Sequence, residues 1–150
     1  MCRRIRKRKE VVMTKLSEYF TLSEMCKTQV KGFNNIPNAE QTNNLKRLCG
    51  WLEKLRLEWN NRYGDGDDPI IINSAFRSSS INKAVGGSAT SNHLSGSAAD
   101  IRVLGMEQLM RYATILLDIS DKTKENFDEL LMERKGNSLW LHFAVRETGN

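Results

Sequence analysis

The sequence predicts an α+β fold, in which a small, mostly antiparallel sheet has helices packed on one side. Two segments repeat apolar residues at helical spacing, and four short segments have the apolar composition and flanking turn residues of strands. The 150 residues, of which 39% are hydrophobic and 27% charged, suit one globular domain with one core.

The chain is predicted to begin with an arm and a long helix. Residues 13–30 are expected to form an arm that ends in a short helix, with Ser23 as its N-cap. Residues 38–63 are the clearest helix, and Asn38 with Gln41 resembles a capping box at its start. One face of this helix carries an apolar stripe at spacings of three and four, made of Leu45, Leu48, Leu52, Leu55 and Trp59.

Short elements follow the long helix. The acidic run at 65–68 is predicted to be a solvated turn rather than a calcium loop, because the rest of a twelve-residue ligand pattern is missing. Residues 70–72 and 98–103 have the composition of short strands. Between them, residues 79–85 are predicted to form one or two helical turns, which end at the glycine pair 86–87.

The last third of the chain is predicted to be a helix and a hairpin. Residues 106–118 form the helix, and residues 127–133 and 138–146 form two strands around a turn at 134–137. The face of the helix expected to be buried consists of Met106, Leu109, Met110, Ala113, Leu116 and Leu117.

The net charge of +5 originates at the N-terminus. Six basic residues lie there: Arg3, Arg4, Arg6, Lys7, Arg8 and Lys9. Without them, the chain has 17 basic and 18 acidic residues. We therefore expect residues 1–12 to be a solvated, disordered tail outside a domain at 13–150. An arm for nucleic acid or anionic surfaces is the less favoured interpretation of the tail.

Cysteine usage and the N-terminus bear on the cellular compartment. Cys2, Cys26 and Cys49 are odd in number and match no zinc-finger or C-x-x-C spacing, so we expect Cys26 and Cys49 to be reduced structural residues. The basic N-terminus precedes no apolar stretch of a signal peptide, and no apolar run approaches the ~20 residues of a membrane span. These features predict synthesis in the cytoplasm.

The only two histidines of the chain form the strongest chemical signal. His93 precedes small residues that end at Asp100, and a loop that turns at Gly96 would bring the two side chains together. On the last strand, alternation places His142 opposite the core face. Two imidazoles and one carboxylate, with water in the fourth position, are the ligands of a catalytic zinc site. From spacing alone, however, a histidine among small residues is more often a surface or structural residue.

Three stretches of the sequence resemble a known family. IINSAFRSSSINKAVGGSATSNHLSGSAADI, with the later FDELLME and WLHFAV, is similar to the zinc D-Ala-D-Ala carboxypeptidase family of metallopeptidases. Within that family, the chain looks most like the small phage and prophage members that act as endolysins. The resemblance extends from about residue 16 to residue 146, and its most specific part is S-x-H-x-x-G-x-A-x-D between F-R-S and W-x-H.

The resemblance implies a hedgehog/D-Ala-D-Ala peptidase-like fold and one zinc ion per chain, bound by His93, Asp100 and His142. It also implies that Arg77 faces a substrate carboxylate or carbonyl, which a guanidinium can bind with two parallel hydrogen bonds. Considered alone, Arg77 would more readily form a surface salt bridge. Ser91 would bind substrate or support a metal ligand.

The general base is the open point of the resemblance. Better-known relatives carry Glu-x-x-His or a histidine shortly before the last ligand, whereas Leu139 stands three positions before His142 here. The phage-type segment F-D-x-L-I-x-E matches FDELLME, which implies that Glu133 is the base. This assignment assumes a loop in place of a tight hairpin.

Hairpin geometry favours other carboxylates. If residue 134 pairs with 137, Glu129 lies opposite His142, and Glu133 lies about 13 Å further along the strand. One residue of slip would place Asp128 opposite His142 instead. Asp128 and Glu129 therefore remain rivals of Glu133.

The resemblance implies a monomeric zinc peptidase that acts on bacterial peptidoglycan peptides, as a carboxypeptidase or an endopeptidase. An endolysin-like member would reach the cell wall after holin-mediated release. The main alternative is a catalytically inactive zinc- or peptidoglycan-binding domain of the same fold. A nucleic-acid-binding protein is disfavoured, because residues 10–150 have no basic excess.

Overall fold

A computed structural model describes residues 14–146, so the tail expected at 1–12 lies outside the described residues. Along the chain the elements are α1 (Leu22–Met25), α2 (Ala39–Arg62), β1 (Ile72–Ser74), α3 (Ser79–Ala84), β2 (Ala98–Arg102), α4 (Met106–Thr123), β3 (Phe127–Lys135) and β4 (Ser138–Val145). The strands form one antiparallel sheet in the order β1-β2-β4-β3. The predicted α+β class is therefore confirmed.

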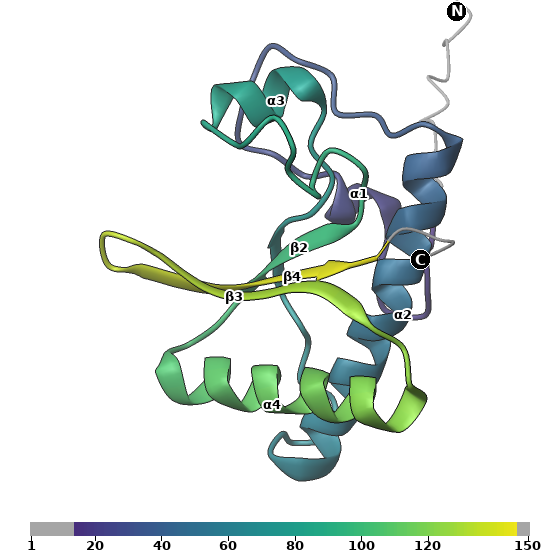
Figure 1. Ribbon diagram of the computed structural model, residues 1–150, viewed down its shortest axis with the longest axis vertical. Helices are drawn as coiled ribbons and strands as arrows, with labels where there is room; N and C mark the ends of the chain where they lie inside the picture. The colour runs from purple at the N-terminus through teal and green to yellow at the C-terminus, as the bar shows by residue number, and fades with distance from the viewer. Residues whose placement is uncertain (1–13, 147–150) are drawn as a thin grey trace, which may run out of the picture.

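The sheet separates two unequal layers (Figure 1). The long helices α2 and α4 pack against each other and against β4, which builds the core on one side. α3 and the loop that follows it lie on the other side of the sheet, whereas the sequence predicted helices on one side only. No helix in residues 14–146 is long and apolar enough to cross a membrane.

Helix α2 follows the sequence prediction closely. The amide of Gln41 donates to the Asn38 side chain and the amide of Asn38 donates to the Gln41 side chain, each at 2.8 Å, which completes the capping box. All five residues of the predicted apolar stripe are buried. The N-cap prediction for α1 is wrong, because Thr21 rather than Ser23 has the extended backbone of a cap and accepts from the Glu24 amide.

Helix α4 is longer than predicted, and its buried face overlaps the predicted one only in part, at Leu109 and Leu116. It extends to Thr123, and its buried residues are Leu109, Tyr112, Ile115, Leu116 and Ile119. Met106, Met110 and Leu117 are about half exposed, contrary to the prediction. Tyr112 faces inward because its ring packs edge-on against Trp59 of α2, at 4.9 Å between centroids. This contact turns the neighbouring apolar stripe toward solvent.

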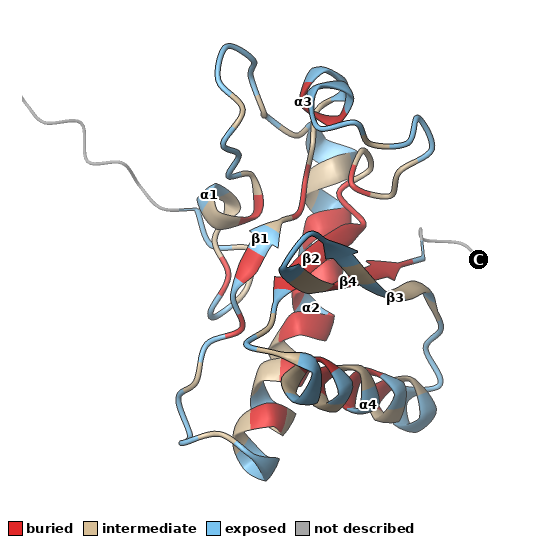
Figure 2. Ribbon diagram, turned by 90° about the vertical axis from the view of Figure 1, so that its left-hand side faces the viewer, coloured by how far each residue is buried: buried red, intermediate tan, exposed pale blue. Residues whose placement is uncertain are grey.

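Strand β4 is the central element of the core. Leu141, Phe143 and Val145 are buried on the face toward the helices, and Trp51 of α2 packs against Phe143 at 5.3 Å between ring centroids. Figure 2 shows that β4 and the neighbouring turns of α2 form a continuous buried region. His142 is buried on the opposite face, beneath the loop that follows α3.

Two strand predictions need correction. β1 begins at Ile72, where the predicted strand was to end. The β3–β4 connection is a tight two-residue turn, because Lys135 pairs with Ser138, and Gly136 takes φ 59° where such turns favour glycine. The two turn residues, Gly136 and Asn137, lie within the predicted turn at 134–137, but the strands pair one residue closer to the C-terminus than expected, and no longer loop is present.

The two cysteines in the described part of the chain are free thiols, as expected. Cys49 is fully buried in the core, and burial raises the pKa of its thiol to about 12. Both cysteines therefore act as apolar packing residues.

Candidate metal centre

Sheet register brings two of the three predicted ligands together. β2 and β4 pair so that Asp100 lies directly opposite His142. Directly opposed residues of an antiparallel pair project from the same face. Both side chains therefore point away from the helical core, toward the layer that contains α3.

The third ligand, His93, comes from the loop between α3 and β2. This loop is fastened to the first turns of α2, because Gln41 Nε2 donates to the Leu94 carbonyl and Asn44 Nδ2 donates to the Ser95 carbonyl. Gly96 turns the loop at φ 76°, and a Cβ there would lie 2.6 Å from the Gln41 carbonyl oxygen. Glycine is thus required by both conformation and space.

The three ligand atoms form one compact group. Asp100 Oδ1 lies 3.2 Å from His93 Nε2 and 2.9 Å from His142 Nδ1, and all three atoms lie within 4.8 Å of one another. Each of the three residues is at most 6% exposed. The structure therefore brings together the three residues that the sequence singled out, in an arrangement that can bind one metal ion.

The hydrogen bond of His93 Nδ1 leaves Nε2 of the same ring free to bind a cation. His93 Nδ1 lies 2.6 Å from the Ala75 carbonyl, and a carbonyl can only accept, so Nδ1 carries the proton. In the neutral ring, Nε2 is then an acceptor whose lone pair faces the Asp100 carboxylate. Two acceptors at this distance need a proton or a metal ion between them. This donor set fits zinc, which binds neutral imidazole and carboxylate.

Electrostatics favour the charged carboxylate. Burial opposes ionisation of Asp100, but hydrogen bonds and charges from His142 and His93 outweigh it and hold its pKa below the usual range. Burial likewise lowers the pKa of His142, but Asp100, Glu133 and Glu129 outweigh that effect and raise it. The site thus provides an ionised oxygen ligand at neutral pH.

Arg77 lies beside this group rather than on a remote surface. Its Nη2 donates to Asp100 Oδ2 at 3.0 Å and its Nε donates to Ser74 Oγ at 3.1 Å. The guanidinium thereby occupies one carboxylate oxygen and leaves Oδ1 to face the two histidines. Ser91 also lies at the site, where its Oγ accepts from the backbone amide of His93 at 3.2 Å.

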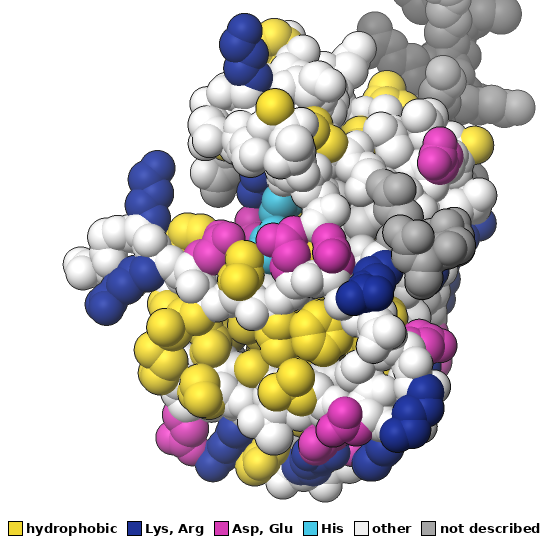
Figure 3. Space-filling model, viewed as in Figure 1, with side chains coloured by type: hydrophobic (Ala, Val, Ile, Leu, Met, Phe, Trp, Pro, Cys, Tyr) yellow, Lys and Arg dark blue, Asp and Glu magenta, His cyan; other side chains and the backbone are white. Residues whose placement is uncertain are grey.

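The ligands form the floor of a cavity of about 560 Å³ that also contains Arg77, Ser91, Glu129 and Glu133. Figure 3 shows the histidines in a recess bordered by acidic side chains, between the upper layer and the sheet. A cavity of this volume lies in the range of small-molecule sites. The metal position is thus accessible to a ligand from solvent.

The register of β3 corrects the hairpin argument. Leu131, not Glu129 or Asp128, lies opposite His142. Glu129 and Glu133 lie two residues to either side of Leu131, so both project from the face of His142 as its diagonal neighbours. The expectation that Glu133 lies about 13 Å beyond the residue opposite His142 is therefore wrong, because it lies only two residues beyond it. The paired ends of the turn are Lys135 and Ser138 rather than 134 and 137, and this shift of one residue changes the register by two.

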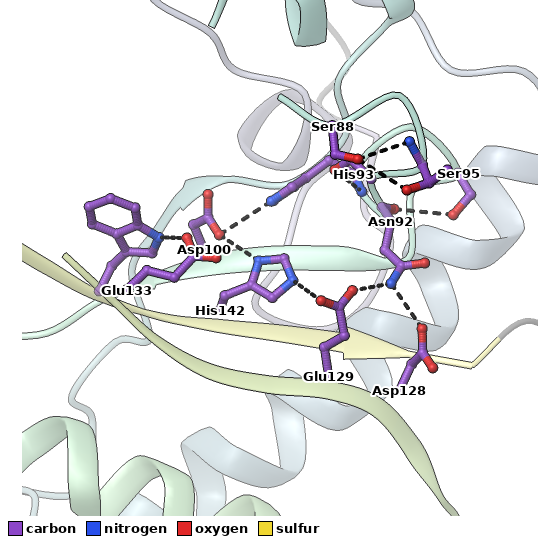
Figure 4. A network of polar contacts seen from close by, with 12 residues as sticks. Ser88, Asn92, His93, Ser95, Asp100, Asp128, Glu129, Glu133 and His142 are labelled. Carbon is purple, nitrogen blue, oxygen red and sulfur yellow. Dashed lines mark hydrogen bonds and ion pairs between the residues drawn. The ribbon is translucent and has the colours of Figure 1, made fainter. Parts of the chain in front are cut away.

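The two glutamates lie on different sides of the His142 ring (Figure 4). Glu133 is on the side of Nδ1 and Asp100, and its Oε2 accepts from Trp140 Nε1 at 2.7 Å. Glu129 is on the side of Nε2, with its Oε2 at 3.6 Å from that atom. The two carboxylates therefore face different atoms of the site.

Two residues of the site were missed from the sequence. Asn92 donates through Nδ2 to both Glu129 and Asp128, and Asp128 lies exposed at an irregularity of β3. Nothing in the sequence pattern indicates this contact between the loop and the strand. Trp140 lies two residues before His142 and so shares its face of β4, but the hydrogen bond of Trp140 to Glu133 depends on the strand register.

Comparison with known proteins gives the family. A profile of the peptidase M15 family matches residues 18–129, which is most of the chain and includes His93 and Asp100. The chain belongs to the peptidase M15 family. As a peptidase M15 member, it is also 48% identical over 40 residues to the zinc D-Ala-D-Ala carboxypeptidase of Streptomyces albus G. That match covers 27% of this chain and 16% of the relative's length.

Proposed function

We propose that the chain is a zinc-dependent peptidase that hydrolyses peptides of bacterial peptidoglycan. The buried group of His93, Asp100 and His142, open to a cavity, is the observation that carries this proposal. Membership of the peptidase M15 family supports peptide hydrolysis. The name of the Streptomyces albus G relative supports zinc and a D-Ala-D-Ala substrate.

His93, Asp100 and His142 would bind the zinc ion through Nε2, Oδ1 and Nδ1, which leaves one position open. When bound, zinc supplies a Lewis acid that lowers the pKa of water toward ~7 and polarises a carbonyl. Buried, preoriented ligands would keep this chemistry at one point of the cavity floor.

Glu133 is proposed as the general base. Its carboxylate lies on the Nδ1 side of His142, the side that faces the other ligands. The Trp140 indole N–H holds Oε2 of Glu133, so Oε1 is left to accept a proton from the attacking water. Glu133 would then pass that proton to the departing amine.

Arg77 and Ser91 are proposed to contact substrate. Arg77 uses Nη2 and Nε for Asp100 and Ser74, so its Nη1 remains for a substrate carbonyl or carboxylate. Ser91 lines the cavity next to His93 and offers a hydroxyl. Both residues would orient a peptide over the ligands rather than take part in proton transfer.

The phage-type segment FDELLME supports the finer proposal of an endolysin-like enzyme that acts on the wall after holin-mediated release. Removal of a terminal D-alanine and cleavage of a cross-bridge are both compatible with an open cavity. Mass spectrometry of purified muropeptides after digestion distinguishes them. Loss of one alanine mass indicates a carboxypeptidase, whereas two peptide fragments indicate an endopeptidase.

The same digestion tests the proposal against an inactive binding domain. We expect cleavage with added zinc, and none with a chelator or in His142→Ala. Intact muropeptides in every sample, together with one bound zinc per chain, would favour the inactive zinc-binding domain.

A further inference from the structure

One nitrogen of the metal centre has no hydrogen-bond partner within the described residues. His142 Nε2 is fully buried, and Glu129 Oε2 lies 3.6 Å from it, beyond hydrogen-bond distance. Burying a polar nitrogen without a hydrogen bond costs free energy, so such atoms normally have a partner. The position of Glu129 therefore needs an explanation.

Two contacts orient the Glu129 carboxylate toward this nitrogen. Glu129 pairs with Ala144 on β4, which places its side chain on the face of His142. Asn92 Nδ2 donates to Oε1 of Glu129, which leaves Oε2 directed at His142. Asn92 directly precedes His93, so the same contact connects the loop that carries one ligand to the strand beside another.

We propose that Glu129 is the positioning residue of His142, whose Nε2–H it accepts so that the Nδ1 lone pair faces the metal. This inference rests on the proposed metal centre. Both histidines would then bind the metal with one ring nitrogen and donate the N–H of the other to an acceptor, since His93 donates its Nδ1–H to the Ala75 carbonyl. Acceptors of this kind fix the tautomer and the ring orientation of metal-binding histidines.

The placement also separates the roles of the two glutamates. Glu133 is on the Nδ1 side and is held by Trp140, so it offers nothing to Nε2. Glu129 is across the ring from the proposed metal position, where it cannot take a proton from a water on the metal side. His142 Nε2 therefore requires the acceptor oxygen of Glu129 and not its negative charge.

The test measures the zinc dissociation constant by competition with a chromophoric chelator. Glu129→Leu removes the acceptor, and we expect zinc binding to weaken by roughly 10–100-fold. Glu129→Gln keeps one acceptor oxygen without the charge. With that oxygen toward His142, it should restore part of the affinity, although the amide nitrogen that replaces Oε1 no longer accepts from Asn92. Asp128→Asn is the matched control, because Asp128 also contacts Asn92 but touches no proposed ligand. Glu133→Gln controls for loss of a negative charge near His142.

The inference is overturned by a charge effect on zinc affinity. Such an effect would appear if Glu129→Gln, or the control Glu133→Gln, weakened zinc binding as much as Glu129→Leu does. Unchanged affinity in Glu129→Leu, or a wild-type chain that binds no zinc, would also overturn the inference. If zinc binds as expected but no muropeptide is cut, the proposed function fails and the role of Glu129 stands.

Nitrogen-15 NMR of the zinc-loaded wild-type chain tests the same point without a variant. We expect zinc on Nδ1 of His142 and a slowly exchanging proton on Nε2. Zinc on Nε2 would overturn the inference. This measurement remains decisive if Glu129→Leu does not fold.

Discussion

Asp100 on β2 and His142 on β4 lie directly opposite each other, with 2.9 Å between Asp100 Oδ1 and His142 Nδ1. Two ligands of the candidate metal centre are therefore positioned by backbone hydrogen bonds of the sheet. The third, His93, depends on a loop that side chains of α2 hold in place. The sheet thus fixes Asp100 and His142 relative to each other, whereas the position of His93 depends on a few contacts of its loop with α2.

The first prediction concerns metal content. His93→Ala and His142→Ala should each lose zinc and activity together, because three protein ligands leave no redundancy. Ser88→Ala, at the rim of the cavity and without contact to a ligand, is the control and should keep zinc. Elemental analysis of the purified variants measures the outcome. One zinc per chain in the double histidine variant would contradict the site.

The second prediction concerns the general base. Glu133→Gln should keep zinc and stability but lower kcat by roughly 10²–10⁴, the usual effect of lost acid–base catalysis. Asp128→Asn should cost much less, since Asp128 is exposed and hydrogen-bonded to Asn92. Kinetics on muropeptides with parallel zinc analysis decides the ranking. Near-normal turnover in Glu133→Gln would remove Glu133 from the mechanism.

A third prediction concerns pH in the metal-free chain. Burial lowers the pKa of His142, but Asp100 and the two nearby glutamates raise it overall. A raised folded-state pKa stabilises the fold fully below the unfolded value of about 6.5, and this contribution is lost as pH rises through the folded pKa. Urea unfolding in chelator should therefore show a His142 contribution that decreases toward high pH. His142→Ala should lack it, and an increase with pH would contradict the prediction.

The fourth prediction concerns the loop that carries His93. Gly96→Ala places a Cβ 2.6 Å from the Gln41 carbonyl oxygen at φ 76°. Gly86→Ala is a matched control, because Gly86 has φ 74° but open space around it. Backbone strain alone costs about 1–3 kcal/mol. We expect Gly96→Ala to lose more free energy of unfolding than Gly86→Ala and also to weaken zinc binding, whereas equal losses would exclude a steric contribution.

The last prediction concerns the N-terminal tail. Residues 1–12 lie outside the described residues and before the family match, which starts at residue 18. Deleting them should leave folding and the cleavage of soluble muropeptides nearly unchanged. Binding to anionic wall polymers should weaken in a salt-dependent way, because exposed charges are screened within ~10 Å at 0.1 M salt. A truncated chain that fails to fold would show that the domain boundary is misplaced.

Local patterns were sufficient for several elements. The helix at 38–63 was predictable because its cap and its stripe are both encoded within a few residues. The buried face of α4 was predictable only in part, because two adjacent apolar stripes lie along it, and contacts with distant residues, such as that between Tyr112 and Trp59, accompany the buried one. The hairpin turn shows the same limit, since a shift of one residue in the turn changes the register by two and so changes which residue lies opposite His142.

The sequence by itself determined the fold class and the family resemblance, because these depend on residue type, spacing and alternation. Through that resemblance it also singled out His93, Asp100 and His142 as the candidate metal ligands. Only the tertiary structure decided the roles open to Glu129 and Glu133. Their separation on the two sides of His142 follows from the β3–β4 register, and the orientation of Glu129 follows from Asn92 on a distant loop. Such contacts join residues far apart in the chain, and no local pattern encodes the distance between them.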